Sequence, residues 1–184
     1  KQMVAFELLH RQNLLETGRE LESMSQLYLY HEAPFQSAKV MKKSIDDGLS
    51  DSNFKNMNLL SIALMNGKDY DESIAPLTNA AELSENGNAY IQLANILLSL
   101  DRYEEATAAI DKGIKKGGVR RADQSRLLQG QAFLSLERFD DARKAFREAA
   151  KVAQDDRSKK GASQLLRYTD SEEKRIKDIK EFLS

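Results

Sequence analysis

Three pairs of adjacent acidic residues are the first feature of this sequence that could support chemistry. They are Asp71-Glu72, Glu104-Glu105 and Asp140-Asp141. Neighbouring carboxylates can share a proton or bind calcium, so acid–base catalysis and cation binding are both open to them. Each pair, however, directly follows an aromatic residue, within a phrase that recurs every 33 to 36 residues. Because a negative charge in the first turn of a helix is favoured by the helix dipole, we interpret the pairs as structural.

The remaining candidates for catalysis and metal binding do not form a site. The chain has no cysteine, which excludes a thiol nucleophile, a disulfide and a thiolate metal site. His10 and His31 are 21 residues apart, and neither has a second ligand at metal-binding spacing. Gly117-Gly118 is followed by Val-Arg-Arg rather than by the Lys-Ser/Thr of a phosphate-binding loop, and no Gly-x-Ser-x-Gly segment occurs. We therefore expect no catalytic residue, no cofactor and no metal, and we predict that the protein is not an enzyme.

A basic cluster surrounds the end of the helix that we predict at residues 103–116. Its members are Lys112, Lys115, Lys116, Arg120 and Arg121. Cations near a helix C-terminus compensate the helix dipole, and we prefer this interpretation to the alternative, a site for a phosphate or an acidic partner. The formal net charge is −1, so there is no bulk attraction to nucleic acid or to an anionic membrane. No apolar run approaches the roughly 18 residues that a membrane span requires.

The acid pairs belong to a repeated unit that must be built from helices. Self-similarity with a period of about 34 residues is typical of a stacked array of helix pairs. A glycine or asparagine just past a helix often adopts the left-handed conformation, and four such signals follow apolar-periodic segments: Asp47-Gly48, Asn66-Gly67, Asn86-Gly87 and Gly117-Gly118. We predict a lone helix at 2–13, helix pairs at 18–31 with 34–47, 54–66 with 70–83, 88–100 with 103–116 and 121–136 with 139–153, and a final segment at 157–182.

Local signals refine these helices. Two acidic pairs at a spacing of three predict capping boxes, Asp69 with Glu72 and Asp101 with Glu104. Pro34 suits the first turn of its helix, whereas Pro76 lies two turns inside one, where we expect a kink or a lost hydrogen bond. In the charged final segment we expect interruptions at Gly161 and Asp170. That segment is interpreted as a capping helix with a polar outer side, and a partner-docking tail is the alternative.

The repeating residues resemble the tetratricopeptide repeat (TPR) family. One repeat carries Tyr90, Leu93, Ala94, Leu97, Tyr103, Ala106 and Ile110, and the next carries Gly130, Phe133, Phe139, Ala142 and Phe146, with Arg126 in place of a large apolar residue. Small residues suit the points where two helices cross closely, and large residues fill the gaps beside them. The resemblance implies an all-α, right-handed solenoid of antiparallel helix pairs with a C-terminal capping helix.

The resemblance extends to earlier parts of the chain. These parts carry Met57, Leu60, Ser61, Leu64, Tyr70, Ser73 and Leu77, and before them Leu21, Met24, Ser25, Tyr28, Ser37 and Met41. We expect a single array over 1–184: a truncated repeat's second helix at 1–15, repeats at 18–50, 54–86, 87–120 and 121–154, and a capping helix at 157–184. The chain begins at Lys1 without a signal segment, so we expect further residues, and any targeting signal, upstream. A half-repeat exposes apolar surface, which favours self-association of the chain.

A stripe of amide and aliphatic residues is the candidate site. In TPR proteins the first helix of each pair lines the concave face, and the resemblance places there Gln26, Tyr30, Asn58, Ile62, Asn66, Ile91, Asn95, Leu98, Leu127, Gln131 and Leu134. Amide side chains can bond a peptide N–H and C=O together, so we predict a groove for a protein or peptide partner. The alternative is that half of these residues merely pack between repeats. Asn58 and Asn95 lack the basic neighbours of carboxylate-clamp TPR proteins, so we do not expect a partner with a strongly acidic terminus.

Two segments, 26–40 and 138–150, followed by 164–168, resemble more narrowly the TPR proteins associated with TonB energy-transduction systems of gammaproteobacteria. This resemblance implies a periplasmic accessory protein for iron uptake, with a cytoplasmic location as the alternative. A TPR chaperone or assembly factor for secretion, pilus or outer-membrane complexes is a second hypothesis. A regulatory TPR segment of a larger enzyme is a third.

Overall fold

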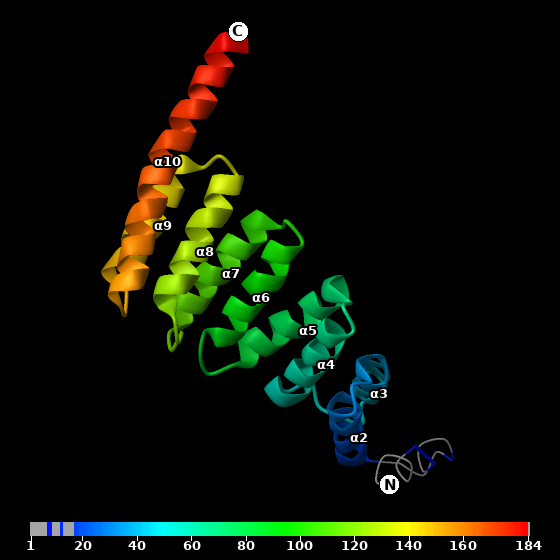
Figure 1. The fold of residues 1–184 in the computed structure, drawn as a ribbon. Helices are drawn as coiled ribbons and strands as arrows, with labels where there is room; N and C mark the ends of the chain where they lie inside the picture. The colour runs from blue at the N-terminus through cyan, green and yellow to red at the C-terminus, as the bar shows by residue number, and fades with distance from the viewer. Residues whose placement is uncertain (1–6, 9–11, 13–16, 184) are drawn as a thin grey trace. The chain divides into compact units, whose positions relative to one another are not determined.

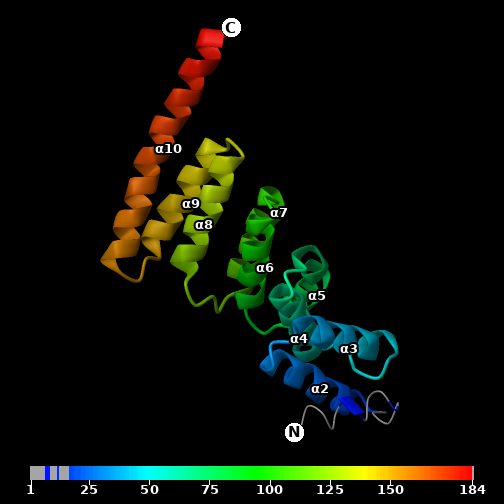
Figure 2. The ribbon, with the colours of Figure 1, turned by 45° about the vertical axis from the view of Figure 1, so that its right-hand side comes forward.

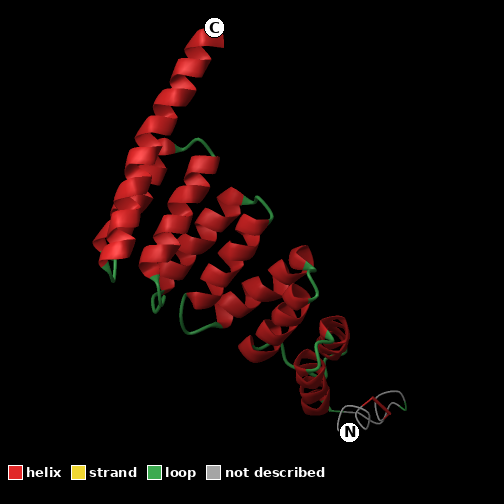
Figure 3. Cartoon of the chain, viewed as in Figure 1, coloured by secondary structure: helices red, strands yellow, loops and turns green. Residues whose placement is uncertain are grey.

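The computed structural model describes residues 7, 8, 12 and 17–183 of the chain. The predicted helix at 2–13 and the truncated repeat at 1–15 therefore lie almost entirely outside the described residues. Regular structure in the described part is helical (Figure 3). The helices form sequential antiparallel pairs (Figure 1): α2 (Gly18–Tyr30) with α3 (Pro34–Asp46), α4 (Phe54–Asn66) with α5 (Tyr70–Leu83), α6 (Asn88–Ser99) with α7 (Tyr103–Lys116), and α8 (Ala122–Ser135) with α9 (Phe139–Lys151), before α10 (Asp156–Leu183). The predicted all-α fold of paired helices is confirmed, with helix ends within two residues of the prediction.

The chain divides into two compact units, which we call the N-terminal unit (Lys1–Ser84) and the C-terminal unit (Glu85–Ser184). In the N-terminal unit, α3 packs on α2 and α4, and α5 packs on α4. In the C-terminal unit each helix from α6 to α10 packs on the next, and α10 also contacts α8. Packing between successive helices thus builds each unit from its own core.

Close helix crossings in the C-terminal unit use residues with little or no side chain. A Cβ added to Gly130 would lie 2.3 Å from Cε1 of Phe146, so the Phe146 ring occupies the space that a larger residue at 130 would need. Phe146, Ala142 and Ala106 are fully buried. The predicted alternation of small and large residues is therefore confirmed here.

The corresponding crossing in the N-terminal unit is built from two serines. The hydroxyl oxygens of Ser25 on α2 and Ser37 on α3 lie 2.8 Å apart, and the Ser37 hydroxyl also contacts the Ser25 carbonyl oxygen at 2.8 Å. Both residues are fully buried. Since a buried hydroxyl without a partner is costly, the two serines are tolerated because they bond each other and the backbone.

The turn inside each helix pair places a non-glycine residue in the left-handed conformation. The φ angles of Glu32, Lys68, Asp101 and Glu137 are 56°, 65°, 56° and 54°. In each turn the next residue's N–H donates to the carbonyl five residues back, as from Asp69 to Leu64 at 2.9 Å. The glycine prediction is right for Gly48, Gly117 and Gly118, which have positive φ. It is wrong for Gly67 and Gly87, with φ of −76° and −78°; at the first of these, Lys68 takes the left-handed position instead.

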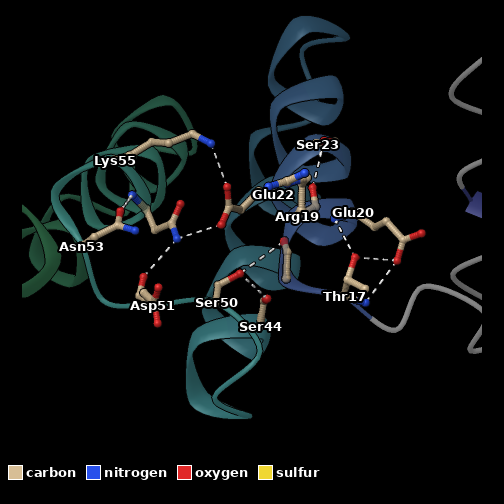
Figure 4. A network of polar contacts seen from close by, with 12 residues as sticks. Thr17, Arg19, Glu20, Glu22, Ser23, Ser44, Ser50, Asp51, Asn53 and Lys55 are labelled. Carbon is tan, nitrogen blue, oxygen red and sulfur yellow. Dashed lines mark hydrogen bonds and ion pairs between the residues drawn. The ribbon is translucent and has the colours of Figure 1, made fainter.

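The predicted capping boxes are wrong. Asp69 is the N-cap of α5 but accepts no hydrogen bond there, and Asp101 lies one residue before the N-cap of α7, Arg102. A left-handed residue precedes or occupies each position, at Lys68 and Asp101, and the Asp101 carboxylate accepts from the Tyr103 hydroxyl at 2.6 Å rather than from a backbone N–H of the first turn. A complete capping box occurs instead at α2, where Thr17 and Glu20 bond each other's backbone N–H (Figure 4).

The last helix is uninterrupted, which corrects the expected breaks at Gly161 and Asp170. Gly161 faces open space, and Asp170 accepts a hydrogen bond from Arg143 on α9 at 2.8 Å. Neither residue disturbs the backbone, because one has no steric conflict and the other gains an ion pair. With 28 residues α10 is longer than α9, which has 13, and its last turns extend beyond that neighbour (Figures 1 and 2). Pro76 is buried within α5, which continues through it.

Candidate functional site

The eleven predicted partner-binding residues all lie outside the cores. In the N-terminal unit, Gln26 and Tyr30 are on α2, and Asn58, Ile62 and Asn66 are on α4; in the C-terminal unit, Ile91, Asn95 and Leu98 are on α6, and Leu127, Gln131 and Leu134 are on α8. None of them is buried, and Tyr30 is 81% exposed. The first helices therefore leave these side chains at least partly exposed while neighbouring positions form the cores. Their binding role stays a prediction.

Part of this set also packs against a core. Leu127 and Leu134 are half-buried against the cluster that contains Phe133, Ala142 and Phe146. The Tyr30 ring meets the His31 ring edge-on, with centroids 5.2 Å apart. Aliphatic members thus serve partly as packing, whereas Gln26, Asn95 and Gln131 are exposed amides.

In the N-terminal unit an ion pair joins the two first helices (Figure 4). Lys55 at the start of α4 donates to Glu22 on α2 at 2.7 Å, and the Asn56 amide donates to the other oxygen of Glu22 at 2.9 Å. Burial raises the pKa of Glu22, but the hydrogen bonds from Lys55 and Asn56 outweigh it, so the pKa is lowered overall. The Asn56 side-chain oxygen is buried and lacks a hydrogen-bond partner in the described part of the chain. Sequence reasoning missed this contact, although Glu22 and Lys55 are one repeat period apart.

In the C-terminal unit a hollow of about 290 Å³ lies between α6 and α8, and we call it the α6–α8 hollow. Two predicted residues, Ile91 and Asn95, line it. The other lining residues are Asn88, Gln92, Val119, Arg120, Arg121, Gln124, Ser125 and Leu128. Amide groups and aliphatic side chains therefore meet in this hollow.

A larger hollow of about 850 Å³ lies between α8 and the start of α10, and we call it the α8–α10 hollow. It shares Arg121 and Gln124 with the first hollow and contains one predicted residue, Leu127. The other lining residues are Asp155, Arg157, Ser158, Lys160, Gly161 and Gln164. Sequence reasoning missed the contribution of α10, because the packing of its first turns beside α8 is a tertiary feature. The remaining predicted residues of this unit do not line either hollow.

Arg121 is held in place at the junction of the two hollows. Its guanidinium donates to both carboxylate oxygens of buried Asp123, at 3.0 and 2.9 Å, and to the Ser158 hydroxyl at 3.1 Å. The hydrogen bonds from Arg121 hold the pKa of Asp123 well below its usual range, despite the opposing effect of burial. This pair therefore fixes the start of α8 beside α10. The pair thus gives Arg121, one member of the basic cluster, a structural role.

Other members of the basic cluster also have structural contacts. The ammonium groups of Lys112 and Lys116 lie 6.0 and 5.7 Å from the centroid of the Tyr90 ring, within cation–π range. The Arg120 backbone N–H donates to the Asn88 side chain at 3.1 Å. These contacts favour the structural interpretation of the cluster.

The acid pairs lie in the first turns of the second helices, as predicted. Glu105 pairs with Arg102 at 2.6 Å, and Asp140 pairs with Arg143 at 2.9 Å. No group of three or more His, Cys, Asp or Glu residues suited to a metal occurs within the described residues, which exclude His10. In the same part of the chain, none of the helices is both long and apolar enough to cross a membrane.

Two segments of the chain match a known protein family. Residues 87–115 and 123–156, all within the C-terminal unit, match the family described as tetratricopeptide repeat. A search of curated proteins gave no match.

Solved structures show the same fold. The structure of MamA superposes with a TM-score of 0.64 at 19% identity, covering 81% of this chain and 85% of that one. MamA from Desulfovibrio magneticus RS-1 gives 0.60 at 16% identity, covering 88% and 97%. The TPR domain of Arabidopsis OM64 gives 0.51 at 24% identity, covering 62% and 94%. The chain thus has a TPR-like fold of paired helices, and its residues 87–115 and 123–156 are similar in sequence to tetratricopeptide repeats.

Proposed function

We propose that this protein is a non-enzymatic scaffold in which the first helices of each unit bind a peptide segment of a partner protein. The observation that carries the proposal is the α6–α8 hollow, where Ile91 and Asn95 meet further amide and aliphatic side chains. The TPR repeats support a role in protein–protein interaction. The partner class is therefore protein, with no cofactor required.

The chemistry of the exposed residues suits a peptide backbone. Asn95 and Gln131 are exposed, and Asn58 is half-buried. Each amide offers both a donor and an acceptor, which matches the alternating groups of an extended chain. Aliphatic neighbours such as Ile91 supply apolar contact area without charge. The aliphatic side chains would therefore contribute affinity for the peptide, and the amides would fix its orientation.

A capture experiment tests this proposal. The wild-type chain and the triple variant Asn58→Ala/Asn95→Ala/Gln131→Ala are used as baits for partner proteins. Since the three side chains lie outside the cores, the variant should keep its helical circular dichroism while partner recovery falls by about tenfold, equivalent to about 1.4 kcal/mol. Equal recovery by a folded variant contradicts binding along the first helices. A control is Asn79→Ala, which removes an exposed amide from α5, outside both hollows.

We further propose that the scaffold serves a periplasmic TonB-type uptake system. This proposal rests only on the resemblance of segments 26–40 and 138–150 to TPR proteins of such systems. Cell fractionation of the full-length protein, followed by cross-linking in cells, tests it. Recovery from the periplasm with TonB-system components is the expected result. Recovery with secretion, pilus or outer-membrane assembly proteins instead would favour the chaperone hypothesis.

A further inference from the structure

The α8–α10 hollow has an excess of positive charge. Its charged lining residues are Arg121, Arg157, Lys160 and Asp155. Arg121 is already neutralised by buried Asp123 and by Asp155, the latter at 3.4 Å. The charge available to a ligand therefore comes from Arg157 and Lys160, two exposed residues in the first turns of α10.

A neighbouring hollow of about 400 Å³ extends this cationic strip along α10. It shares Lys160 and Gln164 with the α8–α10 hollow and adds Lys159 and Arg167, with Asp156 as its acid. Residues 157, 160, 164 and 167 are three or four positions apart, so they lie on one side of the helix. Two adjoining hollows thus share one row of cationic and amide side chains.

The cations of this strip differ from most arginines of the same unit. Arg102, Arg126 and Arg138 bond carboxylates within the unit, at 2.6, 2.8 and 2.5 Å. Arg143 also bonds acids of α9 and α10. Within the described residues, Arg157, Lys160 and Arg167 form no ion pair. Their charge is therefore available to an external anion.

Some of the residues that line the α8–α10 hollow are uncharged. Leu127 provides half-buried apolar surface, and Gln124 and Gln164 provide amide groups. Gly161 has no side chain, and a Cβ built there would meet nothing within 4 Å, so the wall of the hollow is open at that point. Apolar surface and amides beside cations suit a peptide better than a nucleic acid, whose binding draws mainly on many phosphate contacts.

We propose that the α8–α10 hollow binds an acidic peptide segment, with Arg157 and Lys160 bonding its carboxylates and Leu127 contacting an aliphatic side chain. The inference deepens the proposed scaffold function and rests on it. It also revises the expectation of a partner without acidic character, because that expectation considered only the first helices. The cations of α10 come from outside those helices.

The test measures binding of defined probes to the whole chain. The probe is a fluorescein-labelled peptide, (Glu-Glu-Leu)4, and its uncharged match is (Gln-Gln-Leu)4. Fluorescence anisotropy at low salt should show that the acidic peptide binds at least about tenfold more tightly than the match, a difference of about 1.4 kcal/mol. The affinity for the acidic peptide should fall as salt is added, since exposed charges are screened.

Charge reversal locates the site. Arg157→Glu/Lys160→Glu should weaken binding of the acidic peptide by at least about tenfold. The control Arg147→Glu/Lys174→Glu makes the same change in net charge at exposed positions outside the hollow, and should change affinity by less than about threefold. Circular dichroism confirms that both variants are folded.

A second variant tests the site without changing charge. Gly161→Leu adds bulk where a Cβ meets open space, so it should preserve the fold and obstruct the hollow. It should weaken binding of the acidic peptide, whereas Gly161→Ala should have little effect. The Gly161→Leu variant still tests the site if the charge-reversal variant does not fold.

Three outcomes overturn the inference: equal affinity for the two peptides, equal losses in the charge-reversal variant and its control, or tighter binding of a 12-nucleotide single-stranded DNA than of the acidic peptide. The last would indicate a nucleic-acid site. None of these removes the scaffold proposal, which the Asn58/Asn95/Gln131 variant tests separately. If capture of a protein partner depends on those amides while the acidic peptide does not bind, only the present inference fails.

Discussion

The two units solve the same packing problem with different residues. In the C-terminal unit, Gly130 lets the Phe146 ring fill the helix crossing. In the N-terminal unit, Ser25 and Ser37 meet at the crossing and bond each other at 2.8 Å. Close approach requires small residues in both cases, but a hydroxyl is acceptable only with a partner.

The two units also differ in how some of their charged side chains are used. In the N-terminal unit, Lys55 and Glu22 bond each other across α2 and α4. In the C-terminal unit, Arg157 and Lys160 line a hollow between α8 and α10 without an ion pair in the described residues. Ion pairs therefore join helices in both units, as from Arg143 on α9 to Asp170 on α10, and the C-terminal unit also has cations that remain available to a ligand.

The largest expected effect is at the C-terminal crossing. Gly130→Ala would place a Cβ 2.3 Å from the Phe146 ring, which is fully buried and cannot move aside without disturbing the core. We expect the free energy of unfolding to fall by about 3 kcal/mol, as in overpacked cores. Urea denaturation measures it. A loss below about 1 kcal/mol would show that the crossing can expand, and the comparison of the two units would lose its steric basis.

Acid should affect the anchor of the C-terminal unit strongly. Arg121 lowers the folded-state pKa of Asp123, so the stability that this pair contributes is complete above the unfolded-state pKa, near 4. It is lost as pH falls through the lower, folded-state pKa. Asp123→Asn should therefore be less stable than wild type at pH 7, and the difference should narrow below about pH 4.

Urea denaturation at pH 7, 4 and 3 measures this dependence. Glu22→Gln is the matched variant of the N-terminal unit, where the pKa shift is also downward but the group is only partly buried. We expect a smaller difference between pH 7 and pH 3 for this variant. An unchanged pH profile in Asp123→Asn would contradict the anchoring role of the pair.

The serine crossing should show coupling between its two members. Ser25→Ala or Ser37→Ala alone should cost about 1–2 kcal/mol, because the remaining buried hydroxyl loses a partner. The double variant should cost less than the sum of the single variants, since both hydroxyls are removed together. A double-mutant cycle from thermal or urea unfolding measures the coupling. Strict additivity would mean that the two hydroxyls act independently.

The smallest effect concerns a feature that the units share. Lys68 in the N-terminal unit and Glu137 in the C-terminal unit have φ of 65° and 54°, a conformation that costs a non-glycine residue about 1 kcal/mol. Lys68→Gly and Glu137→Gly should each raise the free energy of unfolding by up to about 1 kcal/mol, reduced by the flexibility of glycine in the unfolded chain. Unequal gains would show that the two turns are not equivalent. Gly67→Ala is a control, since its φ is −76°.

Local pattern predicted the helices but not their caps or their continuity. The spacing of apolar residues placed each described helix within two residues, because burial of one face depends on period alone. Asp69 was expected to cap α5 and does not, and Lys68 before it has the left-handed conformation. Gly161 and Asp170 were expected to interrupt α10, yet one faces open space and the other pairs with Arg143. The outcome at Asp170 depends on a neighbour 27 residues away in the sequence, which a local pattern does not include.

The candidate site likewise has one part that the sequence predicted and one part that it did not. The stripe on the first helices could be read from the repeat register, and its residues do lie outside the cores. The α8–α10 hollow could not, because it needs Leu127 of α8 and Lys160 of α10 side by side. By itself, the sequence determined the helix period, the small residues at the crossings and the pairing of neighbouring helices, which all follow from local periodicity and side-chain volume. Only the tertiary structure decided which charges bond each other and which line a hollow, since electrostatic pairing depends on distances between separate helices.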